Sequence, residues 1–254
     1  MRCAIVTGAA QGLGRAVALR LLQDGMNVVA ADVQGEKLAT VGALLEKQAD
    51  RFHPVPVDLG KPQGAADLVD AALVWGGRVD VLVNAAGGSG HTAAREIEDT
   101  TDTLWSSVID SNLNATFYTC RSVSGTMRKA GYGRIINFSS TLVDGSTMWP
   151  STVGARLAYC AAKGGIEAFS RQLALDLAPC GITVNVIVPG FILTEPGARV
   201  RERFQALSAE DRQRLLGGRS GDELAGPDDI AEAVAFLASE RSGHVNGALL
   251  RIGA

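Results

Sequence analysis

A tyrosine and a lysine stand four positions apart in the small-residue stretch AYCAAK, residues 158–163. On a helix, side chains at positions i and i+4 share a face, so Tyr159 and Lys163 would place a phenol beside an ammonium. A free phenol, with a pKa of about 10, is a poor base at neutral pH, but a neighbouring positive charge lowers that pKa. The pair could therefore transfer a proton, although an ordinary solvated helix edge would show the same spacing.

A second group of residues has the spacing of a phosphate-binding loop. The stretch TGAAQGLG, residues 7–14, follows an apolar run and opens an amphipathic segment. Its glycines permit a tight turn and a close approach of the backbone to a pyrophosphate, which the free N–H groups of a helix N-terminus attract. The residues predicted to contact a dinucleotide here are Gly8, Gln11, Gly12, Leu13 and Gly14.

Asp32 ends the next apolar run and stands 18 residues past Gly14. Its carboxylate could accept hydrogen bonds from an adenosine ribose, and it would repel a 2′-phosphate. The residues that follow it, Val33 and Gln34, supply no positive charge for such a phosphate. The sequence therefore favours NAD over NADP, while a helix N-cap is the alternative role for this aspartate.

Short apolar runs alternate with amphipathic stretches along the chain. Most runs are apolar at every position, which is typical of strands buried between two helix layers in a parallel sheet. The runs cover residues 3–7, 27–32, 52–57, 79–85, 134–139, 182–188 and 248–252. We expect an α/β fold: a single Rossmann-type doubly wound domain over residues 1–254, with a seven-stranded parallel sheet and helices on both faces. The charged, glycine-dotted segment 191–225 lacks a strand pattern and is predicted to be a surface excursion or a substrate lid.

Composition argues against several classes of function. The formal net charge is −3, so no basic surface for a nucleic acid or a membrane is expected. The arginines at positions 199, 201 and 203 alternate with apolar and acidic residues, which predicts a solvated helix face. Four scattered cysteines and three histidines predict neither a disulfide framework nor a metal site. With no signal or membrane-spanning pattern, we expect a cytoplasmic protein.

Four motifs occur in an order that resembles a known family. They are TGAAQGLG, then NAAG (84–87), YCAAK (159–163), and PG (189–190) with Thr194. Together they resemble the short-chain dehydrogenase/reductase family, classical type, over nearly the whole chain. The resemblance implies an oxidoreductase that transfers a hydride between NAD(H) and a secondary alcohol or ketone. It also implies a small-molecule substrate and a homo-oligomer, either a tetramer or a dimer.

The resemblance implies further cofactor contacts. Asp58, with Leu59, would approach the adenine amino group, although Asp58 could be a helix N-cap. The turn after the fourth strand would line the cofactor, although Asn84 could be purely structural. The strip after the sixth strand would hold the nicotinamide, and Tyr159 and Lys163 would reach its ribose. The turn and the strip comprise Asn84, Ala85, Ala86, Gly87, Pro189, Gly190, Ile192 and Thr194.

The resemblance also assigns catalytic roles. Tyr159 would transfer the proton, and Lys163 would tune its pKa. Asn112, in SNLNATF, would hold a water that links Lys163 to bulk solvent, although an ordinary surface residue is the alternative.

The serine that would hold the substrate oxygen has two candidates. Ser146 stands 159 − 146 = 13 residues before Tyr159, the separation usual in the family, whereas Ser140 follows the fifth apolar run at 159 − 140 = 19 residues. We favour Ser140, because active sites of open parallel sheets form at the carboxyl ends of strands. Side chains alternate along a strand, so Ser139 is expected to face the other way.

The longer spacing implies an insertion of 19 − 13 = 6 residues before the tyrosine helix. The stretch DGSTMWPSTVGARL (144–157) carries Met148 and Trp149, which we expect to border the substrate pocket. Packing on the sheet edge or on a neighbouring subunit is the alternative for both side chains.

Two other functions stay open. A 3-oxoacyl-thioester (acyl carrier protein) reductase fits the same motifs, and Arg128, Lys129 and Arg171 could meet an acidic carrier protein. Members of that kind usually use NADPH, which Asp32 disfavours. A non-catalytic dinucleotide sensor would be expected if the catalytic residues were broken, and they are intact.

Overall fold

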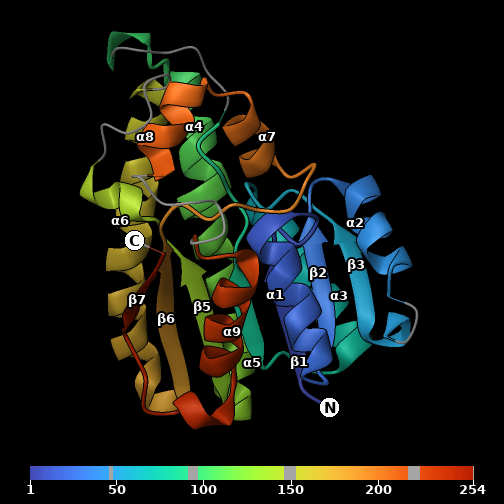
Figure 1. Ribbon diagram of the computed structural model, residues 1–254. Coiled ribbons are helices and arrows are strands. Elements are labelled where there is room, and N and C mark those ends of the chain that lie inside the picture. The colour runs from blue at the N-terminus through green and yellow to red at the C-terminus, as the bar shows by residue number, and fades with distance from the viewer. Residues whose placement is uncertain (46–47, 91–96, 146–152, 217–223, 254) are drawn as a thin grey trace.

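The computed structural model describes residues 1–45, 48–90, 97–145, 153–216 and 224–253, and it contains one parallel sheet within these ranges. The strands lie in the order β3-β2-β1-β4-β5-β6-β7 (Figure 1). Their bounds are β1 Cys3–Thr7, β2 Asn27–Asp32, β3 Phe52–Pro56, β4 Val81–Asn84, β5 Gly133–Phe138, β6 Ile182–Pro189 and β7 Leu249–Ile252. The predicted fold class is confirmed.

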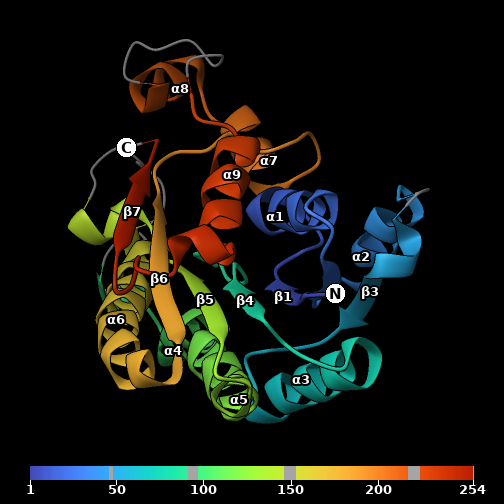
Figure 2. The same cartoon turned by 90° about the horizontal axis from the view of Figure 1, so that it is seen from below.

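Helices cover both faces of this sheet. Figure 2 shows α1, α2 and α9 on one side and α3, α5 and α6 on the other. The helices are α1 Gly12–Gln23, α2 Gly35–Ala43, α3 Pro62–Gly76, α4 Asp102–Ile109, α5 Ala115–Ala130, α6 Val153–Leu177, α7 Arg199–Gln205, α8 Ala209–Leu216 and α9 Pro227–Ala238. In the part of the chain that the structure describes, no helix has both the length and the apolar character needed to cross a membrane.

Strand β1 shows why the apolar runs have no polar face. Its five residues are all buried. Ala4 and Val6 belong to the core under α1 and α9, while Cys3 and Ile5 belong to the core under α3 and α5. Because successive side chains of a strand point to opposite faces, a sheet covered on both sides needs an apolar residue at every position.

The order of the strands reverses between β1 and β4. These two strands are hydrogen-bonded neighbours, with Thr7 opposite Asn84 at their carboxyl ends. The chain leaves β1 toward β2 on one side and continues from β4 toward β5 on the other. Ligands of open α/β sheets bind outside the carboxyl ends of the strands at such a reversal. Helix α7 lies above this edge of the sheet (Figure 1).

Candidate active site

A cavity of about 1090 Å³ opens at the carboxyl ends of the strands, where most of the predicted residues meet. The predicted residues that line it are Gly8, Gln11, Gly12, Leu13, Gly14, Asp32, Asp58, Leu59, Ala85, Ala86, Gly87, Ser140, Tyr159, Lys163, Pro189, Gly190, Ile192 and Thr194. Asn84 and Asn112 are buried and do not line it. Met148, Trp149 and Ser146 lie outside the described residues.

The glycine loop is packed too tightly for side chains. A Cβ on Gly14 would lie 2.1 Å from the carbonyl oxygen of Gly8, and one on Gly8 would lie 2.8 Å from that of Ala85. Gly8 also has a φ of 69°, in the left-handed region that favours glycine. The glycines therefore bring the start of α1, with its free N–H groups, against the floor of the cavity.

An internal carboxylate already uses this helix N-terminus. The backbone N–H of Gly12 donates to Glu195 Oε1 at 2.8 Å, and Arg15 NH1 lies 3.6 Å from the same oxygen. The start of α1 thus binds an oxyanion where the sequence predicts a pyrophosphate, which fits the predicted dinucleotide. Glu195 was missed by sequence reasoning, and its position directly after Thr194 was the available signal.

Asp32 holds the glycine loop against β2. Its Oδ2 accepts a hydrogen bond from Ala10 N at 3.1 Å, and its Oδ1 accepts one from Gln34 N at 2.9 Å. Helix α2 begins at Gly35 after Gln34, whose side chain makes no cap bond, so the N-cap alternative for Asp32 is wrong. A carboxylate has about four acceptor sites, and the two used here leave capacity on the cavity side.

Asp58 and Thr194 mark the two ends of the predicted cofactor groove. Asp58 accepts from Gly60 N at 3.0 Å, and the residue before α3 is Lys61, so Asp58 is not its N-cap. Thr194 is buried, yet its hydroxyl has no hydrogen-bond partner among the described residues. Buried polar groups are usually bonded, so this hydroxyl fits a ligand amide such as that of a nicotinamide.

Ser140 and Ser139 point to opposite sides of β5. The side chain of Ser140 hydrogen-bonds the Tyr159 hydroxyl at the cavity. Ser139 instead donates to Glu167 Oε1 at 2.8 Å and to the Lys163 carbonyl at 3.3 Å. The alternation expected along a strand is present, and it places Ser140 beside Tyr159.

Lys163 is almost completely buried beside the tyrosine, with 4% of its surface exposed. Its Nζ donates to the Phe138 carbonyl at 2.9 Å and lies 5.4 Å from the centroid of the Tyr159 ring. Burial, together with the charge of Arg199, lowers the pKa of Lys163 to about 7. A group with this pKa can exchange a proton near neutral pH.

The pKa of Tyr159 shifts in the direction opposite to the expectation. Burial raises it, while the hydrogen bond from Ser140 and the charges of Arg199 and Arg203 lower it in part. Lys163 is not among the groups that lower it, and burial disfavours the ammonium of Lys163 itself. The positive charges that act on the phenol come from α7.

Asn112 is a buried clamp on the turn after β4. It lies in a π-helical turn, Asp110–Asn114, between α4 and α5, and it is fully buried, so the surface alternative is wrong. Its Oδ1 accepts from Gly88 N at 3.2 Å, and its Nδ2 donates to Gly88 O at 3.0 Å and to Val108 O at 2.8 Å. Such turns within helices are frequent at functional sites.

Asn84 belongs to a buried polar chain behind the cavity. Its Nδ2 donates to Asn137 Oδ1 at 2.9 Å, and its Oδ1 accepts from Thr119 at 2.8 Å. Asn137 in turn donates to Ser170 at 2.8 Å. These hydrogen bonds join β4, β5, α5 and α6. Asn84 therefore has the structural role that the sequence analysis gave as its alternative.

Two arginines of α7 border the cavity: Arg199 is exposed, as the predicted solvated face requires, whereas Arg203 departs from that prediction. Arg199 and Arg203 line the cavity, and Arg203 is partly buried. Arg199 donates to Gly87 O at 2.7 Å, and Arg203 donates to Ser89 Oγ at 2.9 Å. Arg201 does not line the cavity and donates to Thr194 O at 2.8 Å. Positions i and i+4 share a helix face, and this spacing was the signal that the sequence offered.

Comparison with known proteins identifies the family. The family model described as short chain dehydrogenase matches residues 2–204. The chain belongs to the short-chain dehydrogenase/reductase family and is an oxidoreductase. The cofactor of this family is a nicotinamide dinucleotide, and the loop at α1 has the features that such a cofactor needs.

Relatives of different activities share this architecture. The chain is 35% identical over 258 residues to D-threitol dehydrogenase of Mycolicibacterium smegmatis, covering 99% of this chain and 91% of that protein. It is 31% identical over 251 residues to the 3-oxoacyl-[acyl-carrier-protein] reductase FabG of Haemophilus influenzae, covering 99% and 96%. The crystal structure of gox2181 superposes with a TM-score of 0.86 at 29% identity, covering 99% and 93% of the two chains.

Proposed function

We propose that the protein is an NAD-dependent dehydrogenase and ketoreductase that interconverts a secondary alcohol and a ketone. The observation that carries this proposal is the meeting of Ser140, Tyr159 and Lys163 at one end of a cavity whose other end holds Asp32. The span of one cavity from a proton-transfer group to a ribose-binding carboxylate suits a dinucleotide with a substrate beside it.

The proposed reaction needs a proton and a hydride. In the reducing direction the carbonyl oxygen accepts the proton of the Tyr159 phenol, and in the oxidising direction the phenolate takes a proton from the alcohol. When bound, the nicotinamide supplies or accepts the hydride at the carbonyl carbon. Ser140 holds the substrate oxygen beside the phenol, and Lys163 holds the ribose and returns the proton to Tyr159. Asn112 fixes the turn after β4, and the predicted water would lie between it and Lys163.

NAD is the proposed form of the cofactor because of Asp32. Its carboxylate is buried at the end of β2 and is held by two backbone N–H groups. A 2′-phosphate at this point would meet a fixed negative charge, whereas ribose hydroxyls would find an acceptor. Among described residues lining the cavity, the basic ones lie at positions 156, 163, 199, 203 and 251, none of them near Asp32 in sequence.

The remaining proposed cofactor contacts are the predicted residues of the groove. They are Gly8, Gln11, Gly12, Leu13, Gly14, Asp58, Leu59, Ala85, Ala86, Gly87, Pro189, Gly190, Ile192 and Thr194. We further propose that the segment 191–225 is the substrate lid of a single domain. A homo-oligomer in the cytoplasm is the proposed form of the enzyme.

A second candidate is a 3-oxoacyl-thioester reductase. The similarity to FabG favours it, because that relative is matched over nearly its full length. Asp32 disfavours the NADPH expected for such an enzyme. The two candidates therefore differ in cofactor as well as in substrate.

The test measures initial rates of NADH and NADPH formation or consumption by absorbance. The panel contains secondary alcohols, polyols, 3-hydroxyacyl thioesters and the corresponding ketones. We expect turnover with NAD(H), and a fall in the preference for NAD(H) over NADP(H) of roughly tenfold or more in Asp32→Asn, which removes the charge but keeps an acceptor. Turnover with NADP(H) alone would instead favour the thioester reductase. Tight binding of NADH without turnover of any panel member would favour the sensor.

A further inference from the structure

Glu167 is a buried carboxylate of α6 that the proposed reaction does not use. Its Oε1 accepts a hydrogen bond from the Ser139 hydroxyl at 2.8 Å, and its Oε2 lies 3.7 Å from Arg171 NH2. Burying a carboxylate is costly unless the group is paired and hydrogen-bonded. Ser139 and Arg171 meet that requirement, and Ser139 does so directly behind the candidate active site.

Glu167 is the third of three residues spaced by one helical turn along α6. Positions i and i+4 share a helix face, so Tyr159, Lys163 and Glu167 form one stripe. Each member of this stripe hydrogen-bonds one residue of the stretch 138–140 at the carboxyl end of β5. The stripe therefore aligns α6 with the part of the chain that carries the candidate catalytic serine.

Ser139 is the residue at which the chain leaves the sheet. Strand β5 ends at Phe138, and the N–H of Ser139 still donates to Ile187 O at 2.8 Å. Ser140, which is extended, comes next and precedes a 3-10 turn. Adjacent side chains of an extended chain point in opposite directions, so a contact that holds the Ser139 side chain also sets the direction of Ser140.

We propose that Glu167 is a positioning residue of the proton-transfer site: its hydrogen bond to Ser139 directs the Ser140 hydroxyl toward Tyr159. Glu167 is not among the described residues that line the cavity, so it acts through the two serines. A bond to a carboxylate is shorter and stronger than one between neutral groups, which suits it to this role. The inference rests on the proposed function, because Ser140 and Tyr159 are the groups that Glu167 aligns.

Steady-state kinetics of Glu167→Leu, with a substrate found in the panel, test the alignment. Leucine keeps much of the volume of the side chain but cannot accept the hydrogen bond. We expect kcat to fall about tenfold or more, because small displacements of a reacting group are costly, while the affinity for NADH stays within about threefold. Glu167→Gln keeps an acceptor oxygen and should retain kcat within about threefold of the wild type.

Ser170→Ala is the matched control. Ser170 also lies on α6, is buried, and accepts a hydrogen bond from Asn137 Nδ2 of β5 at 2.8 Å, but it contacts the strand before its end. This substitution should lower the thermal midpoint without the loss of kcat. Equal losses of kcat in Glu167→Leu and Ser170→Ala would give Glu167 a merely structural role and overturn the proposal.

A double-mutant comparison shows whether the effect passes through Ser140. In the Ser140→Ala background, Glu167→Leu should reduce kcat by less than about a further twofold, because the hydroxyl that it positions is already gone. An undiminished loss in that background would contradict the proposal. Ser139→Ala removes the donor with a smaller change in volume. It replaces Glu167→Leu if that variant does not fold, and the same outcomes apply to it.

Crystal structures of the variants give a readout that needs no turnover. In Glu167→Leu we expect the Ser140 hydroxyl to lie beyond about 3.5 Å from the Tyr159 hydroxyl, and in Glu167→Gln within hydrogen-bond distance of it. An unchanged bond between Ser140 and Tyr159 in Glu167→Leu would overturn the positioning role. A displaced Ser140 in that variant, when the unmodified enzyme turns over no compound of the panel, would support the positioning role and contradict the proposed function.

Discussion

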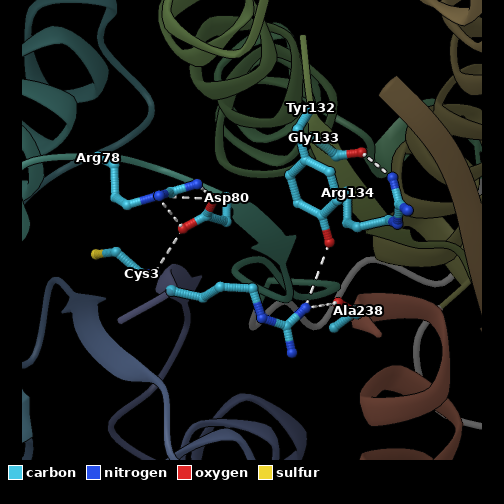
Figure 3. A network of polar contacts seen from close by, with 8 residues as sticks. Cys3, Arg78, Asp80, Tyr132, Gly133, Arg134 and Ala238 are labelled. Atoms are coloured by element: carbon cyan, nitrogen blue, oxygen red, sulfur yellow. Dashed lines mark hydrogen bonds and ion pairs between the residues drawn. The ribbon is translucent and has the colours of Figure 1, made fainter. Parts of the chain in front are cut away.

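At the amino ends of the strands polar side chains bond mainly to one another and to the backbone, whereas at the carboxyl ends they line a cavity. Figure 3 shows the amino-end network. Asp80, 2% exposed, accepts from Cys3 N at 2.8 Å and from Arg78 Nε at 2.9 Å. Arg2 NH1 donates to Ala238 O at 2.9 Å and to the Tyr132 hydroxyl at 3.3 Å.

Arginine side chains have different roles at the amino and carboxyl edges of the sheet. Arg134, buried at the amino edge, donates to Gly133 O at 2.9 Å and lies 4.4 Å above the Tyr132 ring. At the carboxyl edge, Arg199 donates to Gly87 O and its charge lowers the pKa of Arg203. The amino edge therefore stabilises the sheet, and the carboxyl edge presents charged side chains to a cavity that a ligand can enter.

The largest effect expected at the carboxyl edge is the loss of proton transfer. Tyr159→Phe should reduce kcat by about 10²–10⁴-fold, because the phenol is the proposed acid and base. The affinity for NADH and the thermal midpoint should change little, since Phe keeps the ring that packs beside Lys163. Absorbance assays and thermal unfolding measure both. A variant as active as the wild type would remove Tyr159 from the mechanism.

The largest effect expected at the amino edge is on stability. Asp80→Ala should lower the free energy of unfolding by roughly 1–3 kcal/mol, because it leaves the buried N–H of Cys3 without an acceptor. Arg78→Gln should cost less than about 1 kcal/mol, because the Arg78 side chain is 53% exposed and solvent screens its charge. Urea titration gives both values. A large loss of kcat in Asp80→Ala, with the free energy of unfolding unchanged, would contradict a purely structural role for the amino edge.

A smaller effect is expected where the protein's own carboxylate lies on the cofactor site. Glu195→Gln removes a negative charge from the start of α1 and should tighten NADH binding roughly two- to fivefold. The control is Glu202→Gln, an exposed change on α7. Fluorescence titration measures the affinity. Weaker binding in Glu195→Gln would show that this carboxylate supports the cofactor instead of competing with it.

The smallest effect expected is a displacement of the pH profile. Oxidation requires deprotonated Tyr159, so its rate should rise with pH through the phenol pKa, which burial places above the ordinary value. The Arg199 charge lowers that pKa, so Arg199→Gln should move the rise to higher pH. Arg214→Gln should leave the profile in place. A shift of the rise to lower pH in Arg199→Gln would contradict the assignment of this rise to Tyr159.

Features that depend on strand pattern were predictable from the sequence. The runs 3–7 and 27–32 coincide with β1 and β2, because both faces of these strands are buried and leave an uninterrupted apolar signal. The positions of Asp32 and Ser140 follow from the same signal, since each residue stands where a buried strand ends. The preference for Ser140 over Ser146 came from this rule rather than from the family spacing.

Features that depend on distant contacts were not predictable. Arg199 meets Gly87 across 112 positions of sequence, and only the path of the excursion after β6 brings them together. The burial of Asn112 depends on a π-helical turn, and a single turn of this kind leaves no recognisable pattern of apolar residues in the sequence. The direction of the Tyr159 pKa shift depends on how deeply the side chain is buried in the fold. The i,i+4 spacing in the sequence indicates only that Lys163 is a neighbour.

The connection between β5 and α6 is anchored by contacts outside the inserted stretch. Lys163 Nζ bonds to Phe138 O, Ser139 bonds to Glu167, and Cys160 Sγ lies 3.0 Å from Leu142 O. These contacts, none of which involves the stretch 144–157, place Ser140 relative to Tyr159. For evolution, this stretch can gain, lose or exchange residues at small entropic cost. A duplicated gene could in this way acquire a new substrate before any residue of the proton-transfer apparatus changed.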